Sequence, residues 1–445
     1  MKRVQEPARS LRVVAEVDIA VVGGSCTGLF AAVRAARLGA RVAIIEKQNC
    51  FGGMATCGMV NVWHGIHDVD GKQQVIAGLT HEVIKRLDRR RAVMYNNDIN
   101  IAHRLDTEEL KIELDLLAVE SDLNVFFHTM YCAPYVEEGE LKGVVIENKA
   151  GRQVILASFV VDASGDGDLG RDMGLEVFRL HPMQPPTPGF KLYGDISKVN
   201  IADVLQHYGE RYGLPNDWGW GGPIPAAPLL SFRADTHVFN LDCSLAGDLT
   251  AAEIEGRRQI RAVVDTLNHC APVATDVRLA ALCSCIGIRD GAHYVTDYQL
   301  NVDDLLHGTT YDDAIGYGTY RVDIHHGDGA GITFRTLDGR EDIHYDRVTP
   351  PQHRRWREGD DYARYYQIPF RTLVQRKVPN LIMAGRMVNA DQGAFGAIRV
   401  MVNLNQLGEA AGVAAYLAVH QKKAVWDLDA QEIRAAMKAG GSIIL

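Results

Sequence analysis

Residues 18–46 place two apolar runs on either side of a glycine-rich break. The runs at 19–22 and 42–45 contain no polar side chain. Strands that are apolar on both faces are typical of a parallel sheet that is covered on both sides. The alanine-rich segment between the runs has the length and composition of a connecting helix. The pattern therefore predicts a βαβ unit at the start of a doubly wound α/β domain.

Further along, the pattern predicts polar helices within 77–120 and then short strands at 125–138, 141–148 and 154–166. Short strands in succession favour an antiparallel meander attached to the parallel sheet. The expected N-terminal domain is thus a Rossmann-like α/β fold with a parallel sheet and a β-meander.

From about residue 176 prolines and aromatic residues replace the clean apolar runs, which indicates a second domain or a large insertion. Within it we expect strands at 237–244 and 332–337 and a charged helix at 251–267. The α/β pattern returns at 380–420. We therefore expect a discontinuous first domain, residues 1–175 and 366–445, and an inserted mixed α+β substrate or cap domain, residues 176–365.

Composition and charge narrow the class of partner. The net charge is −9 and the basic residues are scattered, which argues against nucleic acid and anionic membranes and favours a small-molecule substrate. The chain has no apolar run of about 18 residues and no signal-like start, so we expect neither a membrane span nor export. Eight cysteines without a regular framework suit the cytoplasm. A homodimer formed through the second domain stays open.

The glycine-rich break has the composition of a pyrophosphate-binding turn. Gly23, Gly24 and Gly28 follow a predicted strand and open a predicted helix, with Ser25 at the second position of the G-x-G-x-x-G pattern. Such a turn exposes backbone N–H groups and the positive end of a helix dipole to phosphates. Glu46 ends the second strand, where an acid binds ribose hydroxyls, so FAD or NAD is favoured over NADP.

Two other motifs carry weaker signals. GDGDLG at 165–170 also follows an apolar strand, but two aspartates would repel a pyrophosphate, so we interpret it as a turn. Cys50 and Cys57 flank a glycine pair, and Cys283 and Cys285 form a CxC pair. A metal or redox site is conceivable there, yet buried cysteines that simply pack are commoner. We assign no metal site.

Four segments, DIAVVGGSCTGL, EKQNCFGGMATCGMVN, VVDASGDGDLG and NLIMAGRMVNADQGAFGAIRVM, occur in this order. Together they resemble the FAD-dependent oxidoreductases related to the glutathione reductase and succinate dehydrogenase flavoproteins. The resemblance covers most of the chain and implies FAD as the cofactor. It implies cofactor contacts from Gly23, Gly24, Ser25, Gly28, Glu46, Lys47, Gly52, Gly53, Met54, Tyr131, Ala163, Gly165, Gly385, Arg386, Asp391 and Gln392.

The resemblance also implies that a helix beginning near Ala397 directs its N-terminus at the flavin, where it would stabilise negative charge on reduction. Catalytic candidates follow from expected proximity to the flavin. They are His64 and His67, just after the GGMAT loop, with Arg289 and His325 from the middle region; His293 and His326 are weaker candidates. Histidine titrates in a useful range, and arginine binds carboxylates. Trp218 and Trp220 could stack on a substrate.

The sequence thus predicts an FAD-dependent oxidoreductase that transfers a hydride between flavin N5 and a polar small molecule. The expected substrate class is a hydroxylated metabolite such as a sugar or a hydroxy acid. Two alternatives stay open at this point. One is a dehydrogenase that binds NAD at the same βαβ unit, and the other is a flavin-binding sensor or partner subunit without turnover. Covalent attachment of the flavin is also left open.

Overall fold

The structure is a computed structural model that describes residues 2–96, 102–273, 276–327 and 329–445. Its centre is a parallel sheet in the order β6-β2-β1-β9-β22. The strands are β1 (Arg12–Val22), β2 (Val42–Ile45), β6 (Asn124–Phe126), β9 (Gly151–Asp162) and β22 (Leu381–Met383). The last strand comes from the C-terminal part of the chain, as the sequence predicts. The βαβ unit at the start is confirmed.

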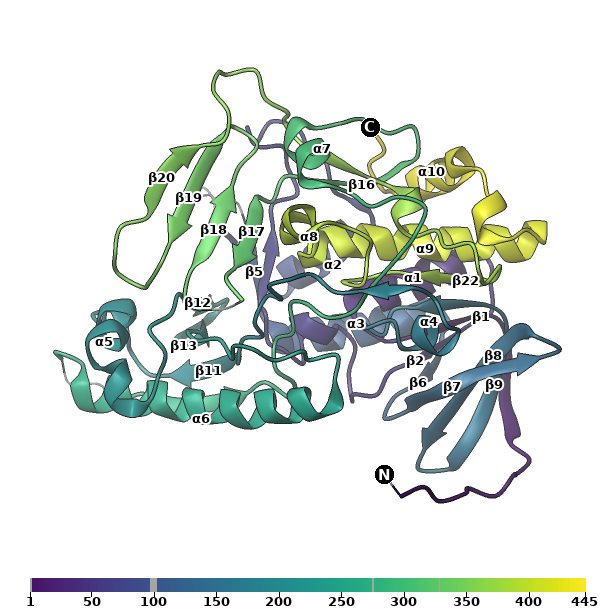
Figure 1. Cartoon of the computed structure of the whole chain (residues 1–445), viewed down its shortest axis with the longest axis horizontal. Coiled ribbons are helices and arrows are strands. Elements are labelled where there is room, and N and C mark those ends of the chain that lie inside the picture. The colour runs from purple at the N-terminus through teal and green to yellow at the C-terminus, as the bar shows by residue number, and fades with distance from the viewer. Residues whose placement is uncertain (1, 97–101, 274–275, 328) are drawn as a thin grey trace.

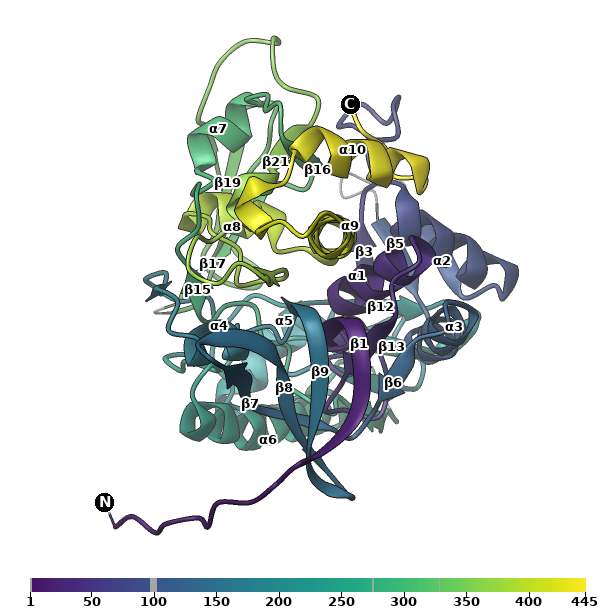
Figure 2. The same cartoon turned by 90° about the vertical axis from the view of Figure 1, so that its right-hand side faces the viewer.

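A β-meander branches off the same sheet through β9. Strands β7 (Met130–Glu137) and β8 (Glu140–Asn148) pair antiparallel, and β8 continues onto the first half of β9. The second half of β9 pairs with β22 instead. The predicted meander is therefore present, although the first predicted strand divides into β6, which joins the parallel edge, and β7. Figure 2 shows β7, β8 and β9 as a twisted ribbon below the helices.

The two faces of the sheet bury different layers. On β1, Ile19 and Val21 pack into the core with the helices, and Ala20 and Val22 pack into a second core with the meander. The helices of the first layer are α1 (Cys26–Arg37), α2 (Gly78–Arg89), α3 (Thr107–Glu120) and α9 (Met401–Gln421). Shorter helices are α4 (Asp168–Asp172), α8 (Gln392–Ile398) and α10 (Ala430–Ala439). This arrangement explains why β1 is apolar on both faces.

Helices α1 and α9 lie against each other with their backbones in close approach. A Cβ atom on Gly408 would lie 2.1 Å from the Thr27 carbonyl oxygen, and one on Gly412 would lie 2.1 Å from that of Ala31. Both contacts advance by four residues, so the helices are parallel and begin at the same end. Only glycine allows this spacing, and Figure 2 shows the two helices adjacent.

A buried ion pair fixes the same two helices in register. Arg34 of α1 and Glu409 of α9 are 3% and 1% exposed and form a direct hydrogen bond. Glu409 also accepts hydrogen bonds from the Leu79 N–H at 3.0 Å and the Ser442 hydroxyl at 3.1 Å. Because every partner of this carboxylate comes from a different segment, α1, α2, α9 and the C-terminal residues are held together at one point.

Residues 176–365 build smaller antiparallel sheets with their own helices. One sheet has the order β12-β13-β11-β14 and another β17-β18-β19-β20. The strands are β10 (Val177–Phe178), β11 (Phe190–Tyr193), β12 (Trp220–Ile224), β13 (Ala227–Ala234), β14 (Arg278–Leu282), β15 (His293–Tyr294), β16 (Ala314–Gly318), β17 (Val322–His325), β18 (Ile332–Arg335), β19 (Arg340–His344) and β20 (Gln352–Arg355). The helices are α5 (Ile201–Tyr208), α6 (Ala246–Cys270) and α7 (Val302–His307). Figure 1 shows α6 along the edge away from α9.

For residues 176–365, the predicted helix and one of the two predicted strands are confirmed, and the other strand is wrong. The helix at 251–267 lies inside α6, and the strand at 332–337 contains β18. The strand predicted at 237–244 is wrong, because these residues form a loop. Asp242 accepts a hydrogen bond from the Ser244 N–H at 2.9 Å, and Asn240 has a φ of 60°. These local bonds make a turn that an extended strand cannot contain.

The hydrophobic cores divide the inserted region in two. Residues of β11, α5 and α6 form a separate core, which includes Phe190, Val204 and Val263. Leu300, Tyr317 and Val322, by contrast, join the core of α1 and α9. The boundaries 176 and 365 of the cap domain stay predictions. None of the helices in the described ranges is both long enough and apolar enough to cross a membrane.

Within the described ranges, three short strands, one further strand and four 3-10 turns complete the fold around the site. Strands β3 (Val62–His64), β4 (Val93–Asn96) and β5 (Ala102–Leu105) form a sheet in the order β3-β5-β4, and β21 (Tyr366–Pro369) pairs with β16. The 3-10 turns are η1 (Gly53–Ala55), η2 (Gly209–Tyr212), η3 (Phe370–Thr372) and η4 (Val425–Asp427).

The close approach of the two helices yields a stability prediction. Gly412→Ala should lower the free energy of unfolding by about 1–3 kcal/mol, because its methyl group would overlap the Ala31 carbonyl and force the helices apart. Gly247→Ala is the matched control. That glycine lies in α6 with no atom within 4 Å of an added Cβ, so the change should be neutral or stabilising. Denaturant unfolding measures both, and equal stability of the two variants would refute the contact.

Candidate active site

A cavity of about 660 Å³ lies where the sheet, the cap strands and the start of α9 meet. Its wall includes the turn after β1, the loop after β2, the ends of β9 and β22, and residues of β3, β12, β13 and β17. The carboxyl ends of parallel strands are where open α/β sheets bind their ligands. The cavity therefore has the position expected of a dinucleotide site.

The glycine turn forms one end of this cavity as a tight cradle. Gly23 has a φ of 102°, and an added Cβ would lie 2.3 Å from the Ala163 carbonyl oxygen. Ser25 caps α1 and accepts a hydrogen bond from the Gly28 N–H at 3.3 Å. Gly23 and Ser25 line the cavity, whereas Gly24 and Gly28 support the turn from behind. Serine at the second position of the motif thus serves as the helix cap.

The loop with the second glycine pair lies against the first turn. The Gly52 N–H donates to the Gly24 carbonyl at 2.9 Å, and residues 25 and 52 form a parallel bridge. A Cβ atom on Gly53 would lie 2.9 Å from the Ser25 Cβ. Gly52, Gly53 and Met54 all line the cavity. The close approach explains why this loop begins with two glycines.

Glu46, Lys47 and Tyr131 line the cavity at the sheet edge beyond the turn. Glu46 is 7% exposed and accepts hydrogen bonds from the Gly24 N–H at 2.6 Å and the Gln48 N–H at 2.7 Å. Burial raises the pKa of this carboxyl, while the two backbone donors oppose the shift. Glu46 therefore joins the end of β2 to the glycine turn. The Tyr131 hydroxyl donates to Asp172 at 3.0 Å, which orients its ring.

The C-terminal segment reaches the cavity in two places. The first is after β22, where Gly385 and Arg386 line the wall beside Ala163 and Gly165 from the end of β9, and Arg386 forms an ion pair with Asp166 at 2.8 Å. The second place is the start of α9, where Met401 and the two residues before it line the wall. The expected helix thus begins at Met401, and a separate helix, α8, occupies residues 392–398.

Asp391 and Gln392 do not line the cavity. Asp391 caps α8 by accepting from the Ala394 N–H at 2.7 Å, and it also accepts from the Val302 N–H at 2.9 Å. Gln392 donates to the Pro182 carbonyl at 2.8 Å. Both side chains are engaged in holding α8 in place. Arg399 and Val400, by contrast, line the wall beside α9.

His64 enters the cavity from the end of β3. Its ring packs on Tyr320, with 3.9 Å between ring centroids, and its Nδ1 atom has no hydrogen-bond partner among the described residues. Burial lowers the pKa of His64 to about 3 and outweighs the favourable field of Asp323. The imidazole is therefore neutral at physiological pH.

A polar cluster from the cap strands faces His64. Asp323 accepts a hydrogen bond from the Tyr320 hydroxyl and lies 3.2 Å from Arg399 and 3.4 Å from the Nε2 atom of His325. Burial holds the pKa of His325 well below its usual value, and the positive charge of the nearby Arg289 lowers this pKa further. Trp218 packs edge-on against His325 at 6.2 Å. The cluster combines a neutral imidazole, a carboxylate and guanidinium groups on one wall.

Arg289 lines the cavity and is held by neutral groups. Its hydrogen bonds go to neutral acceptors, the Pro185 carbonyl at 2.9 Å and the Thr187 hydroxyl. Within the described ranges it forms no ion pair. Burial lowers its pKa to about 9, and Arg399 adds repulsion. Asp323 and Asp217 lie near enough to oppose this shift, but a half-buried cation without an ion pair still favours an anionic ligand.

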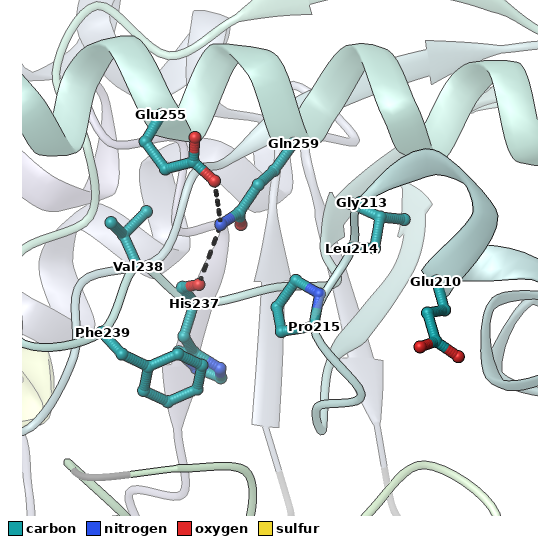
Figure 3. Close-up of a pocket in the computed structure, with 9 residues that line it drawn as sticks. All are labelled: Glu210, Gly213, Leu214, Pro215, His237, Val238, Phe239, Glu255 and Gln259. Atoms are coloured by element: carbon teal, nitrogen blue, oxygen red, sulfur yellow. Dashed lines mark hydrogen bonds between the residues drawn. The ribbon is translucent and has the colours of Figure 1, made fainter.

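His237 connects this cluster to a second, smaller pocket of about 490 Å³. Its Nδ1 atom lies 2.6 Å from Asp217, and its ring lies 4.6 Å from that of His325. Figure 3 shows that the His237 carbonyl accepts from Gln259, which also donates to Glu255. These bonds fix the backbone of His237, so residues of the small pocket hold His237 in place beside His325.

The other histidines named from the sequence lie elsewhere. His67 does not line the cavity, and its carbonyl accepts from Thr319 at 2.9 Å. His293 is fully buried between the Val388 carbonyl and Asp290, and His326 bonds Thr333 at 3.0 Å. Asp328, which the sequence places close enough to His325 and His326 to suggest a metal site with them, lies outside the described residues. In the described ranges no group of three histidine, cysteine or acidic side chains could hold a metal ion.

Several residues of the site were missed by the sequence analysis. Tyr320, Arg321, Arg399, Asp217 and His237 belong to it, and Cys57 and Cys285 also line the cavity. Arg399 had a signal in the sequence, because it lies in the first turn of the helix that was expected to begin near Ala397 and face the flavin. The others depend on how the cap folds back and have no local signal.

Known protein families provide a comparison for this chain. The model of the family described as FAD dependent oxidoreductase matches residues 18–437. The chain belongs to this family. FAD is therefore its cofactor and the protein is an oxidoreductase. The alternative that NAD binds directly in place of FAD is set aside.

Individual relatives are more distant. A thiamine thiazole synthase from Thermococcus kodakarensis is 29% identical over 160 residues, which is 34% of this chain and 59% of the synthase. The chain thus matches less than two thirds of that relative. Among solved structures, a geranylgeranyl bacteriochlorophyll reductase-like protein from Thermoplasma acidophilum has a TM-score of 0.48 at 13% identity, covering 96% and 83% of the two chains. A myxobacterial chondrochloren halogenase has a TM-score of 0.44 at 13% identity, covering 95% and 78%.

The residues present fit FAD. Gly23 and Gly53 line the cavity in tight turns where an added Cβ would collide with Ala163 or Ser25, and α1 and α9 both begin at the cavity. Gly23 and Ser25 would hold the pyrophosphate, Glu46 the ribose, and the N-terminus of α9 the flavin end. These individual contacts stay predictions.

The cofactor assignment leads to a binding prediction. Glu46→Ala should weaken FAD binding by about tenfold or more, because it removes a charged acceptor that also anchors the Gly24 N–H. FAD fluorescence quenching on titration of the apoprotein measures the affinity. Glu82→Ala, which removes a surface partner of Arg37, is the control and should bind FAD normally. Unchanged affinity of the Glu46 variant would remove it from the site.

Proposed function

We propose that this protein is an FAD-dependent oxidoreductase that oxidises a small hydroxy acid at the end of the cavity formed by His64, Arg289, Tyr320 and His325. The observation that carries the proposal is that Arg289, which lines the cavity with His64 and His325, bonds only neutral acceptors and forms no ion pair among the described residues. Bound FAD supplies the two-electron acceptor, which takes a hydride at N5.

The charge pattern supports a carboxylate rather than a neutral substrate. Arg399 is already paired with Asp323 at 3.2 Å, and Arg386 with Asp166 at 2.8 Å, so these two charges are compensated. Arg289 has only neutral acceptors. A guanidinium offers two parallel N–H donors that match a carboxylate. A hydroxy acid would bring such a group, whereas a simple sugar would leave the buried cation unmatched.

The imidazoles supply a place for the hydroxyl proton. Oxidation of an alcohol carbon requires that the hydroxyl proton be accepted while the C–H bond breaks. His64 and His325 each have a nitrogen without a partner among the described residues, and both are neutral by burial. Binding of a carboxylate nearby would raise their pKa values, because an anion favours the charged imidazole. The ligand itself would thus improve the base.

The cap wall would exclude water from the reaction. Trp218, Trp220 and Phe334 line the cavity opposite the FAD-binding residues, and Trp218 packs on Phe334 with 5.9 Å between centroids. Removal of water strengthens each charge interaction inside the cavity. This wall comes from the inserted region, so we propose that residues 176–365 act as the substrate domain.

A sensor or partner subunit without turnover is the second candidate function. It would need FAD binding but no acid–base groups, so the arrangement of His64, Tyr320 and His325 counts against it. We further propose a cytoplasmic protein whose partner is a small molecule, with a homodimer through the cap left to measurement. All eight cysteines are free in the structure, which supports a reducing compartment.

The proposal is tested by anaerobic titration of the FAD-loaded protein with hydroxy acids, polyols and amines. We expect hydroxy acids to bleach the flavin band and matched polyols without a carboxylate to leave it unchanged. Arg289→Met should raise the dissociation constant of the active hydroxy acid by about ten- to hundredfold, because it removes a charged donor. Arg335→Met, which removes a cap ion pair with Glu341, is the control. Bleaching by polyols alone would exclude the hydroxy-acid class.

His64 provides the second test of this function. His64→Ala should keep FAD but slow flavin reduction by roughly 10²-fold or more, because it removes a proton acceptor. His326→Ala is the control, since that histidine bonds Thr333 and does not line the cavity. Stopped-flow absorbance measures the rate. An unchanged rate in the His64 variant would remove it from the mechanism.

The pH dependence of the wild type follows from the same groups. The folded pKa of His64 is lowered to about 3, so the imidazole stays neutral as pH falls through its usual value. The second-order rate constant of flavin reduction reports the free enzyme, so it should not show a histidine inflection between about pH 5 and 8. A clear acid loss near the usual histidine pKa would contradict this assignment.

A further inference from the structure

Three cysteines that are distant in the sequence meet beside the FAD cavity. Cys50 and Cys57 flank the second glycine pair, and Cys285 follows β14 in the inserted region. The Cys50 and Cys57 sulfur atoms lie 3.7 Å apart. The Cys57 carbonyl accepts from the Ser284 N–H at 2.9 Å and the Cys285 N–H at 3.3 Å, which joins the two loops. The cysteine cluster is defined here as Cys50, Cys57 and Cys285.

The three sulfur atoms do not have equal environments. Hydrogen bonds from the Cys285 and Cys50 thiols, helped by Ser284 and Thr56, hold the pKa of Cys57 below its ordinary value against the effect of burial. The same contacts raise the pKa values of Cys50 and Cys285. Cys57 is therefore the sulfur that ionises first, and a thiolate is the reactive form of cysteine.

Access to the cluster is narrow. Cys57 and Cys285 line the cavity, whereas Cys50 lies behind and is 6% exposed. The Cys57 side chain is only 1% exposed. A bulky disulfide cannot reach such a sulfur without displacing the loop, but a molecule of the size of hydrogen peroxide can enter the cavity. The geometry thus selects a small, uncharged oxidant.

We propose that Cys57 and Cys50 form a peroxide-reactive dithiol in the wall of the FAD cavity, with Cys57 as the attacking sulfur and Cys50 as the resolving one. The site takes a small hydroperoxide as its substrate. It requires no particular reaction of the flavin and stands independently of the hydroxy-acid proposal.

The chemistry balances in two steps. The Cys57 thiolate attacks one peroxide oxygen, the O–O bond breaks, and the other oxygen leaves as hydroxide, which takes a proton to become water. Cys57 is then a sulfenic acid. The Cys50 thiol attacks this sulfur, the S–O bond breaks, and a second water leaves as the Cys50–Cys57 disulfide forms. Two thiols lose two electrons and two protons in total, and one hydrogen peroxide becomes two waters.

The separation of the two sulfurs suits the second step. A disulfide bond is about 2.0 Å long, so the sulfurs must approach by less than about 2 Å, a distance within the range of a side-chain rotation. Cys285 assists without joining the bond, because its hydrogen bond keeps Cys57 ionised. Its own removal should therefore slow the reaction and leave the product unchanged.

The test uses the FAD-loaded protein treated with a small excess of hydrogen peroxide, followed by alkylation and peptide mapping. Cys50 and Cys57 lie in one tryptic peptide, residues 48–72, and Cys285 lies in another, residues 279–289. We expect the first peptide to lose two hydrogens and resist alkylation, the thiol count to fall by two, and dithiothreitol to reverse both. A bulky aromatic disulfide should label the more exposed Cys132 or Cys270 first.

Variants separate the three roles. In Cys50→Ser, Cys57 should stop at the sulfenic acid, which dimedone traps, and in Cys57→Ser neither product should form. Cys285→Ser should slow formation of the disulfide by roughly threefold or more at neutral pH. Cys132→Ser is the matched control and should react as the wild type does. The visible flavin spectrum checks that each variant folds.

Three results would overturn the proposal. The first is peroxide oxidation of Cys132 or Cys270 before the cluster. The second is a cross-link between peptides 48–72 and 279–289, which would make Cys285 the resolving residue. The third is peroxide consumption at the wild-type rate by Cys57→Ser with its flavin bound.

Discussion

The parallel contact between α1 and α9 is the constraint on which the site depends. Gly408 and Gly412 allow the two backbones to meet, and Arg34 with Glu409 fixes their register. Because the helices are parallel, both N-termini open at the same cavity. One lies at the glycine turn and the other at Met401. Two helix dipoles therefore direct positive potential at the two ends of one extended site, as an anionic dinucleotide requires.

The same constraint explains the balance of charge inside the cavity. Positive potential from two helices would be unfavourable beside further cations, and two of the arginines that line the cavity have a carboxylate partner. Asp323 accompanies Arg399, Asp166 accompanies Arg386, and Arg321 lies over the Phe334 ring at 3.3 Å. Arg289, like Arg321, has only neutral partners among the described residues. These two arginines lie at the end of the cavity where the cap strands meet His64. This arrangement separates the place proposed for the substrate from the place of the cofactor.

The sequence predicted the features whose cause is local. The apolar runs of β1 and β2, the glycine turn between them and Glu46 lie within thirty residues of one another, so their pattern is enough to place one end of the site. The loop at 237–244 shows the limit of the same reasoning. Its apolar residues suggest a strand, but the side chain of Asp242 bonds the backbone two residues later and makes a turn.

The catalytic end could not be predicted because its parts meet only after the cap folds back. His237 and His325 are far apart in the chain yet have ring centroids 4.6 Å apart, and Cys57 meets Cys285 across more than two hundred residues. The pattern of apolar and polar residues along the sequence carries no signal for such long-range contacts. His64 and Arg289 were named from expected proximity to the flavin, and they do line the cavity, whereas His67, named on the same ground, does not. On β3, alternate side chains face opposite ways, and a loop follows His64 directly.

Helix α8 shows how an unexpected element can shift a site by a few residues. From the sequence we placed the start of a helix near Ala397, so that the residues before it, including Asp391 and Gln392, would approach the flavin. Instead they build a short helix whose Gly396 would, with a Cβ, lie 2.9 Å from the Asp323 carbonyl. Glycine thus lets β17 pack directly on α8, and Arg399, one residue past the helix, reaches Asp323. Helix α8 thus fixes the position of β17 relative to the start of α9. The same short helix therefore positions both the polar cluster of the cap and the expected flavin end of the cavity.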